Sequence, residues 1–243
     1  MKAIFVSDVH LKNSTDKRAL LFLRFLDQTA QTADTFFILG DLFDYWLPNN
    51  SLLEEHFSPF IEWLDRYSRN GRKIVYLLGN HDFFIRDFAK KRWNAELYPG
   101  DGAFRLGGQR VYLAHGDRVY LKDYGYRMLR PLLRNRLTEG LARALPKALT
   151  FQIAQNMSRT SRVYTTLHKV VDCKTLYRDF AREWIAKGED VVILGHNHVP
   201  DFVELEAGSR KGLYINTGDW LTQYTYVTWD GDRWELKYYP EEP

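Results

Sequence analysis

Short runs of β-branched and aromatic residues alternate with amphipathic stretches along the first part of the chain. Five of these runs end at polar turn residues and predict buried strands, at positions 3–7, 35–39, 73–78, 110–114 and 190–194. Between the first three runs, apolar residues recur at helical spacing and predict helices over 16–32 and 51–69. Because strands and helices alternate, the pattern predicts an α/β fold.

The pattern changes after residue 194. Four more apolar runs, separated by turns that contain glycine, predict strands at 202–205, 213–216, 225–229 and 235–239. One of these turns reads Asp230-Gly231-Asp232. Short strands joined by tight turns are typical of antiparallel pairing, so we expect an antiparallel end to the chain.

The central segment, 123–187, has long stretches without strand signals. Arginines lie among leucines that stand four residues apart, a pattern that predicts amphipathic helices; the leucines are Leu129, Leu133, Leu137, Leu141 and Leu145. Pro131 suits the first turn of a helix, and Pro146 should end or kink one. We therefore expect a single domain over 1–243 that contains a helical insertion, or lid, over 120–187. The leucines could line that lid or form the core of the insertion itself.

Composition supports a folded domain. The chain has 243 residues, of which 45% are hydrophobic and 27% are charged, and this excludes a disordered or low-complexity protein. A single cysteine, Cys173, excludes a disulfide framework and a cysteine-rich metal site, and it favours a reducing compartment. The apolar run at the start is too short for a signal peptide, and no run approaches the roughly 18 residues that cross a bilayer. We expect a cytoplasmic protein.

The net charge of +3 hides an uneven distribution. Residues 118–182 hold 14 Lys and Arg against 4 Asp and Glu, so this segment is basic and the rest of the chain is acidic. A basic segment on an acidic body favours an anionic partner, although a solvated surface would account for part of the charge. Charge alone does not distinguish a phospholipid, a nucleotide and a nucleic acid.

Polar clusters follow five of the predicted strands and hold nearly all the side chains that could bind metal. They are Asp8-Val9-His10, Gly40-Asp41, Gly79-Asn80-His81-Asp82, His115-Gly116-Asp117 and Gly195-His196-Asn197-His198. In Asp8-x-His10 the two side chains share one side of an extended segment. Each cluster alone could be a turn or a helix cap. Loops at strand ends converge in α/β sheets, so together the clusters predict one shared metal site. Nitrogen and oxygen ligands without thiolate suit Mn²⁺, Fe²⁺, Co²⁺ or Zn²⁺.

In their order along the chain, these motifs resemble the calcineurin-like metallophosphoesterase family. The resemblance implies a four-layer sandwich of two mixed β-sheets flanked by helices, with two divalent cations, often Mn²⁺, at the strand ends. It implies that one cation is held by Asp8, His10, Asp41 and His198, and the other by Asp41, Asn80, His115 and His196. Two such cations would activate a water for attack on phosphorus, with Asp41 shared between them.

Other residues of these loops are candidates for roles around the cations. His81, which is not a ligand in the family, is expected to stabilise the phosphoryl group or to protonate the leaving oxygen. Asp44 and Asp82 are candidates for orienting the ligands, but each could equally cap a helix or stabilise a turn. The run 216–220 could contact substrate or form a turn anchored by Trp220.

Within the family, the chain resembles in particular the enzymes of lipid A biosynthesis that hydrolyse UDP-2,3-diacylglucosamine. The similarity covers residues 4–11 and 40–44, the His115-Gly116-Asp117 loop and the helical insertion. It implies cleavage of the pyrophosphate of this glycolipid nucleotide to UMP and 2,3-diacylglucosamine 1-phosphate. It also implies a protein peripheral to the cytoplasmic face of the inner membrane. The candidate substrate contacts are Asn80, His81, Lys122, Asp123, Tyr126 and Arg127.

Other functions stay open. The enzymes of this pathway usually have Arg where this chain has His81, so the alternative is a phosphodiesterase or phosphatase of the same family that acts on a soluble nucleotide or another lipid phosphate. A nuclease could use the basic insertion to hold phosphates, but the insertion is rich in leucine rather than in stacking aromatics, so no nucleic acid is expected. A scaffold without activity is disfavoured because every ligand position is filled. The oligomeric state is left open.

Overall fold

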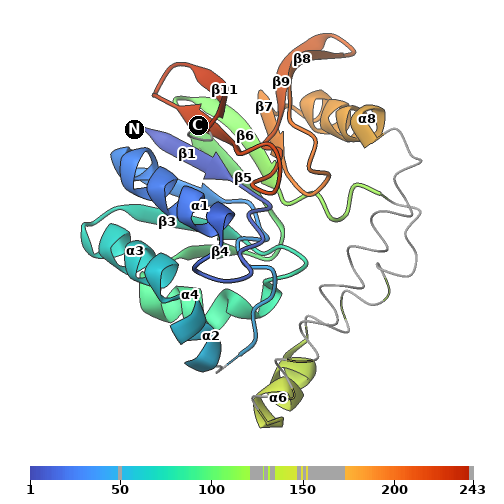
Figure 1. Ribbon diagram of the computed structural model, residues 1–243. Helices are drawn as coiled ribbons and strands as arrows, with labels where there is room; N and C mark the ends of the chain where they lie inside the picture. The colour runs from blue at the N-terminus through green and yellow to red at the C-terminus, as the bar shows by residue number, and fades with distance from the viewer. Residues whose placement is uncertain are drawn as a thin grey trace.

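The computed structural model of the protein (Figure 1) describes residues 1–48, 51–120, 128, 131, 135–146, 149, 152 and 173–240. Its first sheet has the strand order β11-β10-β1-β2-β3-β4. β1 to β4 are parallel, whereas β10 pairs antiparallel with β1 and with β11. The strands are β1 (Ala3–Val6), β2 (Thr35–Ile38), β3 (Lys73–Leu77), β4 (Glu96–Tyr98), β10 (Thr225–Trp229) and β11 (Trp234–Tyr238).

The second sheet has the order β5-β6-β7-β9-β8. Its three inner strands are parallel, and the two edge strands pair antiparallel with them. The strands are β5 (Asp101–Leu106), β6 (Gln109–Ala114), β7 (Val191–Leu194), β8 (Asp201–Ala207) and β9 (Arg210–Asn216). Both sheets are therefore mixed.

Helices cover the outer face of each sheet, so the molecule has four layers (Figure 1). The first sheet is covered by α1 (Lys17–Gln28), α3 (Ser58–Arg69) and α4 (Arg86–Trp93), and the second by α8 (Cys173–Ala186). Alternate residues of a strand face opposite sides. In β1, Phe5 is accordingly buried between the two sheets, whereas Ile4 and Val6 are buried against the helices. The predicted four-layer sandwich is confirmed.

Each predicted strand is present, with ends that differ by three residues or fewer. The helix predicted over 51–69 is instead two helices, α2 (Ser51–His56) and α3, because Pro59 lies in the first turn of α3. Proline lacks an N–H and fits a first turn, but it disrupts a helix interior. The helix predicted over 16–32 is α1 followed by a short 3₁₀ helix, η1 (Ala30–Thr32).

The C-terminal strands form two antiparallel hairpins that belong to different sheets. β8 and β9 pair at the edge of the second sheet, and β10 and β11 pair in the first. β9 also pairs in parallel with β7. The expected antiparallel end of the chain is therefore only partly correct, because β9 continues the parallel run of the second sheet.

Parts of the predicted insertion are described. The helix α6 (Arg136–Ala144) ends two residues before Pro146, as predicted, and exposes Leu137 and Leu141, which are 80% and 68% accessible. α8, at the end of 120–187, packs on the second sheet. Leu129, Leu133 and most of the remaining segment lie outside the described residues, so the lid stays a prediction.

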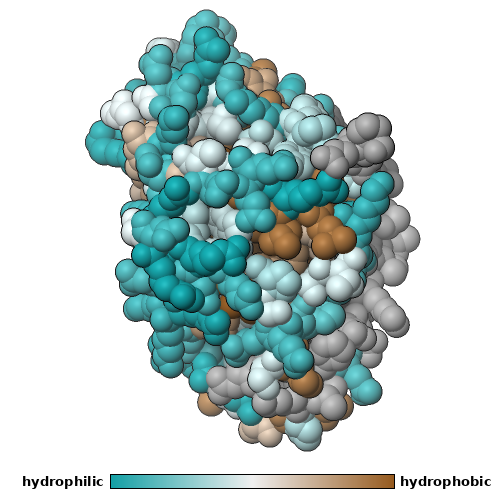
Figure 2. Space-filling model, turned by 60° about the vertical axis from the view of Figure 1, so that its left-hand side comes forward, coloured by the Kyte–Doolittle hydropathy of each residue, from teal (hydrophilic) through white to brown (hydrophobic). Residues whose placement is uncertain are grey.

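The described helices and surface bear on how the protein could meet a membrane. None of the helices that the structure describes has the length and hydropathy needed to span a bilayer. The face drawn in Figure 2 is mostly hydrophilic, with a compact hydrophobic patch near its centre and smaller hydrophobic areas elsewhere.

Candidate metal centre

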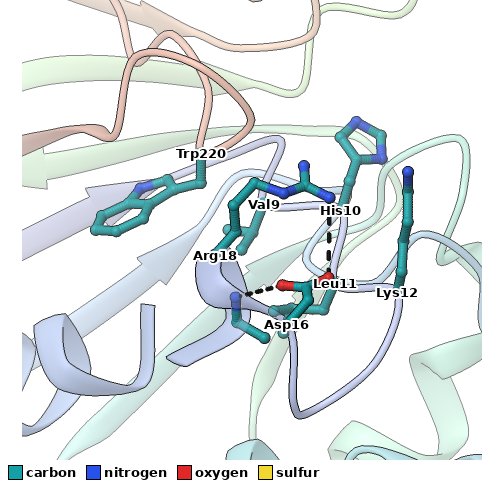
Figure 3. A pocket seen from close by; sticks show the side chains of 8 residues that line it. Val9, His10, Leu11, Lys12, Asp16, Arg18 and Trp220 are labelled. Atoms are coloured by element: carbon teal, nitrogen blue, oxygen red, sulfur yellow. Dashed lines mark hydrogen bonds and ion pairs between the residues drawn. The ribbon is translucent and has the colours of Figure 1, made fainter. Parts of the chain in front are cut away.

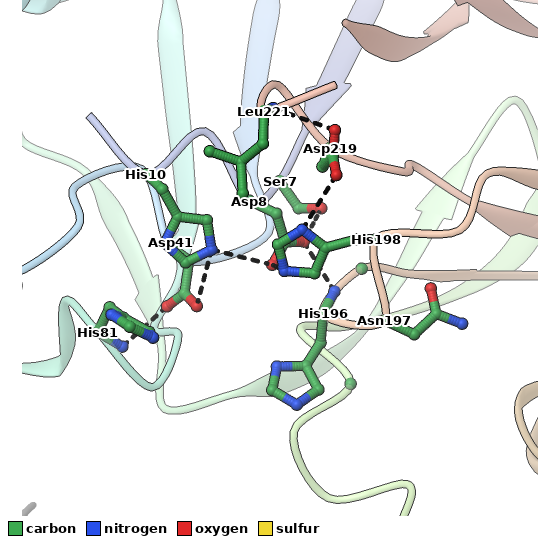
Figure 4. A network of polar contacts seen from close by, with 12 residues as sticks. Ser7, Asp8, His10, Asp41, His81, His196, Asn197, His198, Asp219 and Leu221 are labelled. Atoms are coloured by element: carbon green, nitrogen blue, oxygen red, sulfur yellow. Dashed lines mark hydrogen bonds and ion pairs between the residues drawn. The ribbon is translucent and has the colours of Figure 1, made fainter. Parts of the chain in front are cut away.

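The five predicted polar clusters meet where the parallel strands of both sheets end. Asp8, Asp41 and Asn80 follow β1, β2 and β3 of the first sheet. His115 and His196 follow β6 and β7 of the second. Since parallel strands end at the same edge, their loops converge. The His196 N–H donates a hydrogen bond across the sheets to Asp8 Oδ2 at 2.7 Å (Figure 4).

Asp8, His10, Asp41 and His198 form a first group. His10 Nε2 lies 3.8 Å from both Asp8 Oδ1 and Asp41 Oδ2. His198 Nε2 lies 3.6 Å from Asp8 Oδ1, and the rings of His10 and His198 stack with centroids 5.3 Å apart. Ligand atoms that sit about 2 Å from one cation are roughly 3 to 4 Å from each other, which is the spacing seen here.

A second group surrounds His115. Its Nε2 lies 2.9 Å from Asn80 Oδ1, 3.1 Å from His196 Nδ1 and 3.4 Å from Asp41 Oδ2. The opposite nitrogen, Nδ1, donates a hydrogen bond to the Leu39 carbonyl oxygen at 2.7 Å, so a neutral ring carries its lone pair on Nε2. The lone pairs of His115 Nε2, Asn80 Oδ1 and Asp41 Oδ2 then face one another, and a bound cation stabilises such an arrangement.

Asp8 supplies a test of whether these residues fit a metal ion. Its Oδ2 accepts hydrogen bonds from the Ser7 hydroxyl and the His196 N–H, whereas its Oδ1 is buried without a hydrogen-bond partner. Leaving a charged acceptor buried and unpaired costs about 1 to 3 kcal/mol or more. A cation bound to Oδ1 removes that cost. The donor set of carboxylate, amide and imidazole groups fits the predicted choice of Mn²⁺, Fe²⁺, Co²⁺ or Zn²⁺.

The charges of the site also favour a bound cation. Burial alone would lower the pKa of His10, yet Asp44 and Asp8 raise it to about 10. The pKa of His115 is also raised to about 10 against its burial, chiefly by Asp41. The surrounding imidazoles hold the pKa of Asp8 and of Asp41 well below the usual range, although burial opposes this. The carboxylates attract positive charge, which a divalent cation supplies in place of protons.

Most of these candidate ligands have a strained backbone. Five of them have positive φ, which residues with side chains seldom adopt: Asp8 (52°), His10 (49°), Asp41 (55°), His196 (70°) and His198 (61°). Each such residue costs about 1 kcal/mol or more and is kept where the surroundings enforce it, as at functional sites. The extended Asp8-x-His10 geometry expected from the sequence is therefore wrong, since left-handed turns bring these side chains together.

Comparison with known proteins places the chain in a family. Residues 1–200 match the family described as calcineurin-like phosphoesterase. The protein belongs to this family. The family predicted from the motifs is thereby confirmed, and the protein is a hydrolase of the metallophosphoesterase type.

Three curated relatives are each named UDP-2,3-diacylglucosamine hydrolase. The protein of Pseudomonas aeruginosa (strain UCBPP-PA14) is 31% identical and covers 92% of this chain and 92% of its own length. That of Stenotrophomonas maltophilia (strain R551-3) is 29% identical and covers 97% and 98%. That of Azotobacter vinelandii (strain DJ) is 28% identical and covers 99% of both chains. The similarity thus extends over nearly the whole phosphoesterase.

Two glycines of this phosphoesterase let the loops approach closely. A Cβ at Gly79 would lie 2.1 Å from Asp41 Oδ1, and one at Gly195 would lie 2.4 Å from Ser7 Oγ and 2.8 Å from Asp8 Oδ2. All three distances are shorter than a van der Waals contact, so a side chain at either position would displace a candidate ligand.

Asp82 joins the loops that follow β2 and β3 of the phosphoesterase. Its buried carboxylate accepts hydrogen bonds from the N–H groups of Leu42 at 2.9 Å and Gly79 at 3.0 Å, and from the Tyr76 hydroxyl. Burial and the nearby charge of Asp41 raise its pKa to about 6. These contacts support the loop-orienting role expected of Asp82, which stays a prediction.

His81 and Asp44 lie beside the first group. The His81 N–H donates to Asp41 Oδ1 at 2.9 Å, and its Nδ1 donates to the Asp44 carbonyl oxygen at 2.8 Å. The His81 ring meets the His10 ring edge to face, with centroids 4.8 Å apart, and Asp44 Oδ1 lies 3.5 Å from His10 Nδ1. Both residues therefore lie against candidate ligands, and the roles expected of them stay predictions.

Sequence reasoning missed Asp219. This residue is 3% exposed, and its Oδ2 lies 3.1 Å from His198 Nδ1. Its Oδ1 accepts hydrogen bonds from the N–H groups of Leu221, Thr222 and Gln223, which fix the carboxylate. A fixed carboxylate on one imidazole nitrogen orients the other toward a metal. The run 216–220 was singled out, but only for substrate contact or a turn.

The structure describes two of the six candidate substrate contacts, Asn80 and His81, and both lie at the site. The other four lie outside the described residues, and their role stays a prediction; they are Lys122, Asp123, Tyr126 and Arg127.

Proposed function

We propose that this phosphoesterase hydrolyses the pyrophosphate of UDP-2,3-diacylglucosamine to UMP and 2,3-diacylglucosamine 1-phosphate, a reaction of lipid A biosynthesis. The observation that carries the proposal is its 31% identity, over 92% of both chains, to a protein named for this activity. The site supports it, because every ligand position that the family resemblance implies is filled and converges with the others.

We propose that two divalent cations, Mn²⁺ in the first instance, are held by the two groups. One would be bound by Asp8, His10, Asp41 and His198, and the other by Asp41, Asn80, His115 and His196. Asp41 Oδ2 supports its shared role, since it lies 3.8 Å from His10 Nε2 and 3.4 Å from His115 Nε2. A bound pair of cations lowers the pKa of a water and neutralises charge on the phosphoryl group.

His81 is proposed to act on the substrate rather than on the cations. Its backbone N–H is held by Asp41, and the hydrogen bond from its Nδ1 to the Asp44 carbonyl oxygen fixes the orientation of its ring beside the first group. A fixed imidazole there can hydrogen-bond a phosphoryl oxygen or give a proton to the leaving oxygen. Lys122, Asp123, Tyr126 and Arg127 are proposed as further substrate contacts on the segment after β6.

The proposed substrate carries two acyl chains, so the enzyme must act where lipids are. We propose that it binds the cytoplasmic face of the inner membrane peripherally, through the helical insertion over 120–187. α6 supports this proposal, since it exposes Leu137 and Leu141 and also carries Arg136 and Arg143. Apolar side chains with basic neighbours are typical of helices that lie on anionic membranes.

The test compares two nucleotide sugars in the presence of Mn²⁺. UDP-2,3-diacylglucosamine and UDP-N-acetylglucosamine share the pyrophosphate and differ in the acyl chains, and UMP is identified by mass spectrometry. We expect UMP from the acylated compound at least 100-fold faster. We expect none from either compound with Asp41→Ala, while Asp27→Ala, a surface change, retains the rate.

Failure to cleave either nucleotide sugar, with hydrolysis of a simple phosphodiester retained, would contradict the proposed substrate. It would favour the alternative of a family member that acts on a soluble nucleotide or another lipid phosphate.

A further inference from the structure

One buried side chain, Tyr177, connects α8 to the candidate metal centre. This tyrosine is 4% exposed, and it packs in the core cluster between α8 and the second sheet. Its hydroxyl donates a hydrogen bond to the Gly116 carbonyl oxygen at 3.0 Å. Gly116 directly follows His115, a candidate ligand. A helix that carries none of the candidate ligands therefore holds a loop that does.

The contact lies against the second group of candidate ligands. Gly116 has a φ of 109°, and a Cβ there would lie 3.1 Å from Tyr177 Cε1. The same Cβ would lie 2.9 Å from the Gly195 carbonyl oxygen and 3.3 Å from His196 Cβ. The backbone at Gly116 is thus enclosed between the Tyr177 ring and the His196 loop. Since His115 Nε2 lies 3.1 Å from His196 Nδ1, a shift of either loop would change the distance between these ligand atoms.

The Gly116 carbonyl oxygen does not need the hydroxyl to be paired. The Val119 N–H also donates to it, at 3.1 Å, in the turn that follows β6. A carbonyl group that keeps one hydrogen bond avoids the cost of an unpaired buried acceptor. The hydroxyl of Tyr177 therefore adds a fixed position of this loop relative to α8. Ligands of a working site must be held within about 0.5 Å of their places, so such a restraint matters there.

The two groups of candidate ligands are supported in different ways. In the first group, the loop of His10 continues directly into α1, and His10, Leu11 and the helix cap Asp16 line one small hollow (Figure 3). The His115 loop is instead held by a side chain 61 residues from Gly116 along the chain, on the helix at the end of the segment 120–187. A change in Tyr177 should therefore act on the second group and spare the first.

We propose that Tyr177 is a positioning residue for the cation of the second group. Its hydroxyl holds the loop that carries His115 at the separation from His196 that a shared cation requires. Because α8 ends the segment 120–187, the bond also ties that segment to the cation between the two imidazoles. The inference rests on the pair of cations in the proposed function and is independent of the proposed substrate.

A matched pair of variants separates this role from ordinary packing. Tyr177→Phe removes the hydroxyl and keeps the ring. The control is Tyr67→Phe, because Tyr67 is 3% exposed and its hydroxyl also donates to a backbone carbonyl oxygen, that of Ala33, at 2.9 Å. Ala33 precedes β2, at the opposite end of that strand from Asp41. Both variants lose the same kind of bond, so a general loss of stability affects both.

Mn²⁺ alone is the probe, titrated into each metal-free full chain and followed by calorimetry and electron paramagnetic resonance. Adjacent Mn²⁺ ions couple magnetically, so the spectrum distinguishes a bound pair from a single ion. Asn80→Ala removes a ligand of the second group only and identifies the binding step that belongs to it. Tyr177→Phe should weaken that same step about tenfold, as expected for loss of a group that orients a ligand, and change the other step less than about twofold. The coupled spectrum should then need about ten times more free Mn²⁺, whereas Tyr67→Phe should match the unsubstituted protein.

Equal weakening of both steps, weakening of only the step that Asn80→Ala leaves unchanged, or no change would overturn the inference. An effect of Tyr67→Phe as large as that of Tyr177→Phe would also overturn it. None of these measurements depends on turnover. Failure to hydrolyse UDP-2,3-diacylglucosamine, with the expected Mn²⁺ titrations, would therefore contradict the proposed substrate and support the role of Tyr177.

Discussion

Asp8 illustrates how one residue serves both the fold and the site. Its left-handed backbone is held by a hydrogen bond from its N–H to the Gly40 carbonyl oxygen at 3.2 Å. One carboxylate oxygen is tied to Ser7 and His196, and this leaves the other oriented toward His10 and His198 without a hydrogen bond of its own. The structure therefore stabilises an arrangement that is unfavourable until a cation binds.

Asp219 should control how well His198 binds metal. Replacing Asp219 with Asn removes the charge that orients the imidazole but keeps the shape of the side chain. We expect the affinity for Mn²⁺ to fall by about 10- to 100-fold, the usual effect of losing such a partner, in a calorimetric titration. Asp230→Asn is the control, because Asp230 also accepts backbone hydrogen bonds in a turn but contacts no candidate ligand. Equal affinity in both variants would contradict this role.

The raised pKa values of His10 and His115 predict how pH acts on the metal-free protein. Both values are about 10 in the folded state, above the ordinary 6.5. The stability they add is therefore fully present below pH 6.5 and is lost as pH rises through 10. With a chelator present, we expect the melting temperature to fall between pH 7 and 10 through these two groups.

The protons on His10 and His115 compete with a cation for the same nitrogens. Metal affinity should therefore rise with pH, whereas the stability of the metal-free protein falls. Below pH 10, each proton that a metal displaces makes apparent affinity rise about tenfold per pH unit. Titrations with Mn²⁺ at pH 6.5 and 7.5 measure this. An affinity that is constant over that interval would contradict the assignment of these imidazoles as ligands.

At the scale of elements, the network around Asp65 holds α3 to α4. This carboxylate is 5% exposed and accepts hydrogen bonds from Arg92 and from Trp93 Nε1 at 3.0 Å. Asp65→Ala leaves the buried indole N–H unpaired, so we expect a loss of about 2 to 3 kcal/mol in the free energy of unfolding. Asp27→Ala breaks only an exposed pair with Arg66 at 3.9 Å and should cost less than about 0.5 kcal/mol. Denaturant unfolding compares the two variants.

Strands buried on both faces gave the clearest signal in the sequence, although half-exposed β8 and β11 were predicted as well. In β1 all four residues are buried, and such a strand reads as a continuous apolar run. β4 and β5 were missed because they are short or half-exposed and carry no such run, and α4 was missed because its charged residues obscure the helical pattern. Propensity alone also did not show that Pro59 divides one predicted helix into two.

The site could be predicted as far as its residues lie in recognisable clusters after strands. The role of Asp219 could not, because it depends on the pairing of β9 with β7, in which Asn216 lies opposite Leu194. This register brings the loop after β9 to the same edge as His198. Nothing in the sequence distinguishes a carboxylate that caps a turn from one that also contacts an imidazole.

At the scale of the whole molecule, the candidate metal centre joins the two sheets. Asp8 and Asp41 come from the first sheet and His115 and His196 from the second, and their ligand atoms lie within 4.8 Å of one another. A cation bound there would link the layers on either side of the central core.

The central claim is that these loops bind two divalent cations in one hydrolytic site, and the number of cations bound per chain tests it most directly. Equilibrium dialysis against Mn²⁺, followed by elemental analysis, should find two ions per unsubstituted chain. Asp41→Ala, which removes the carboxylate shared by both groups, should retain at most one and lose hydrolysis of UDP-2,3-diacylglucosamine. A full complement of two ions in Asp41→Ala, or fewer than two in the unsubstituted protein at saturation, would contradict the account.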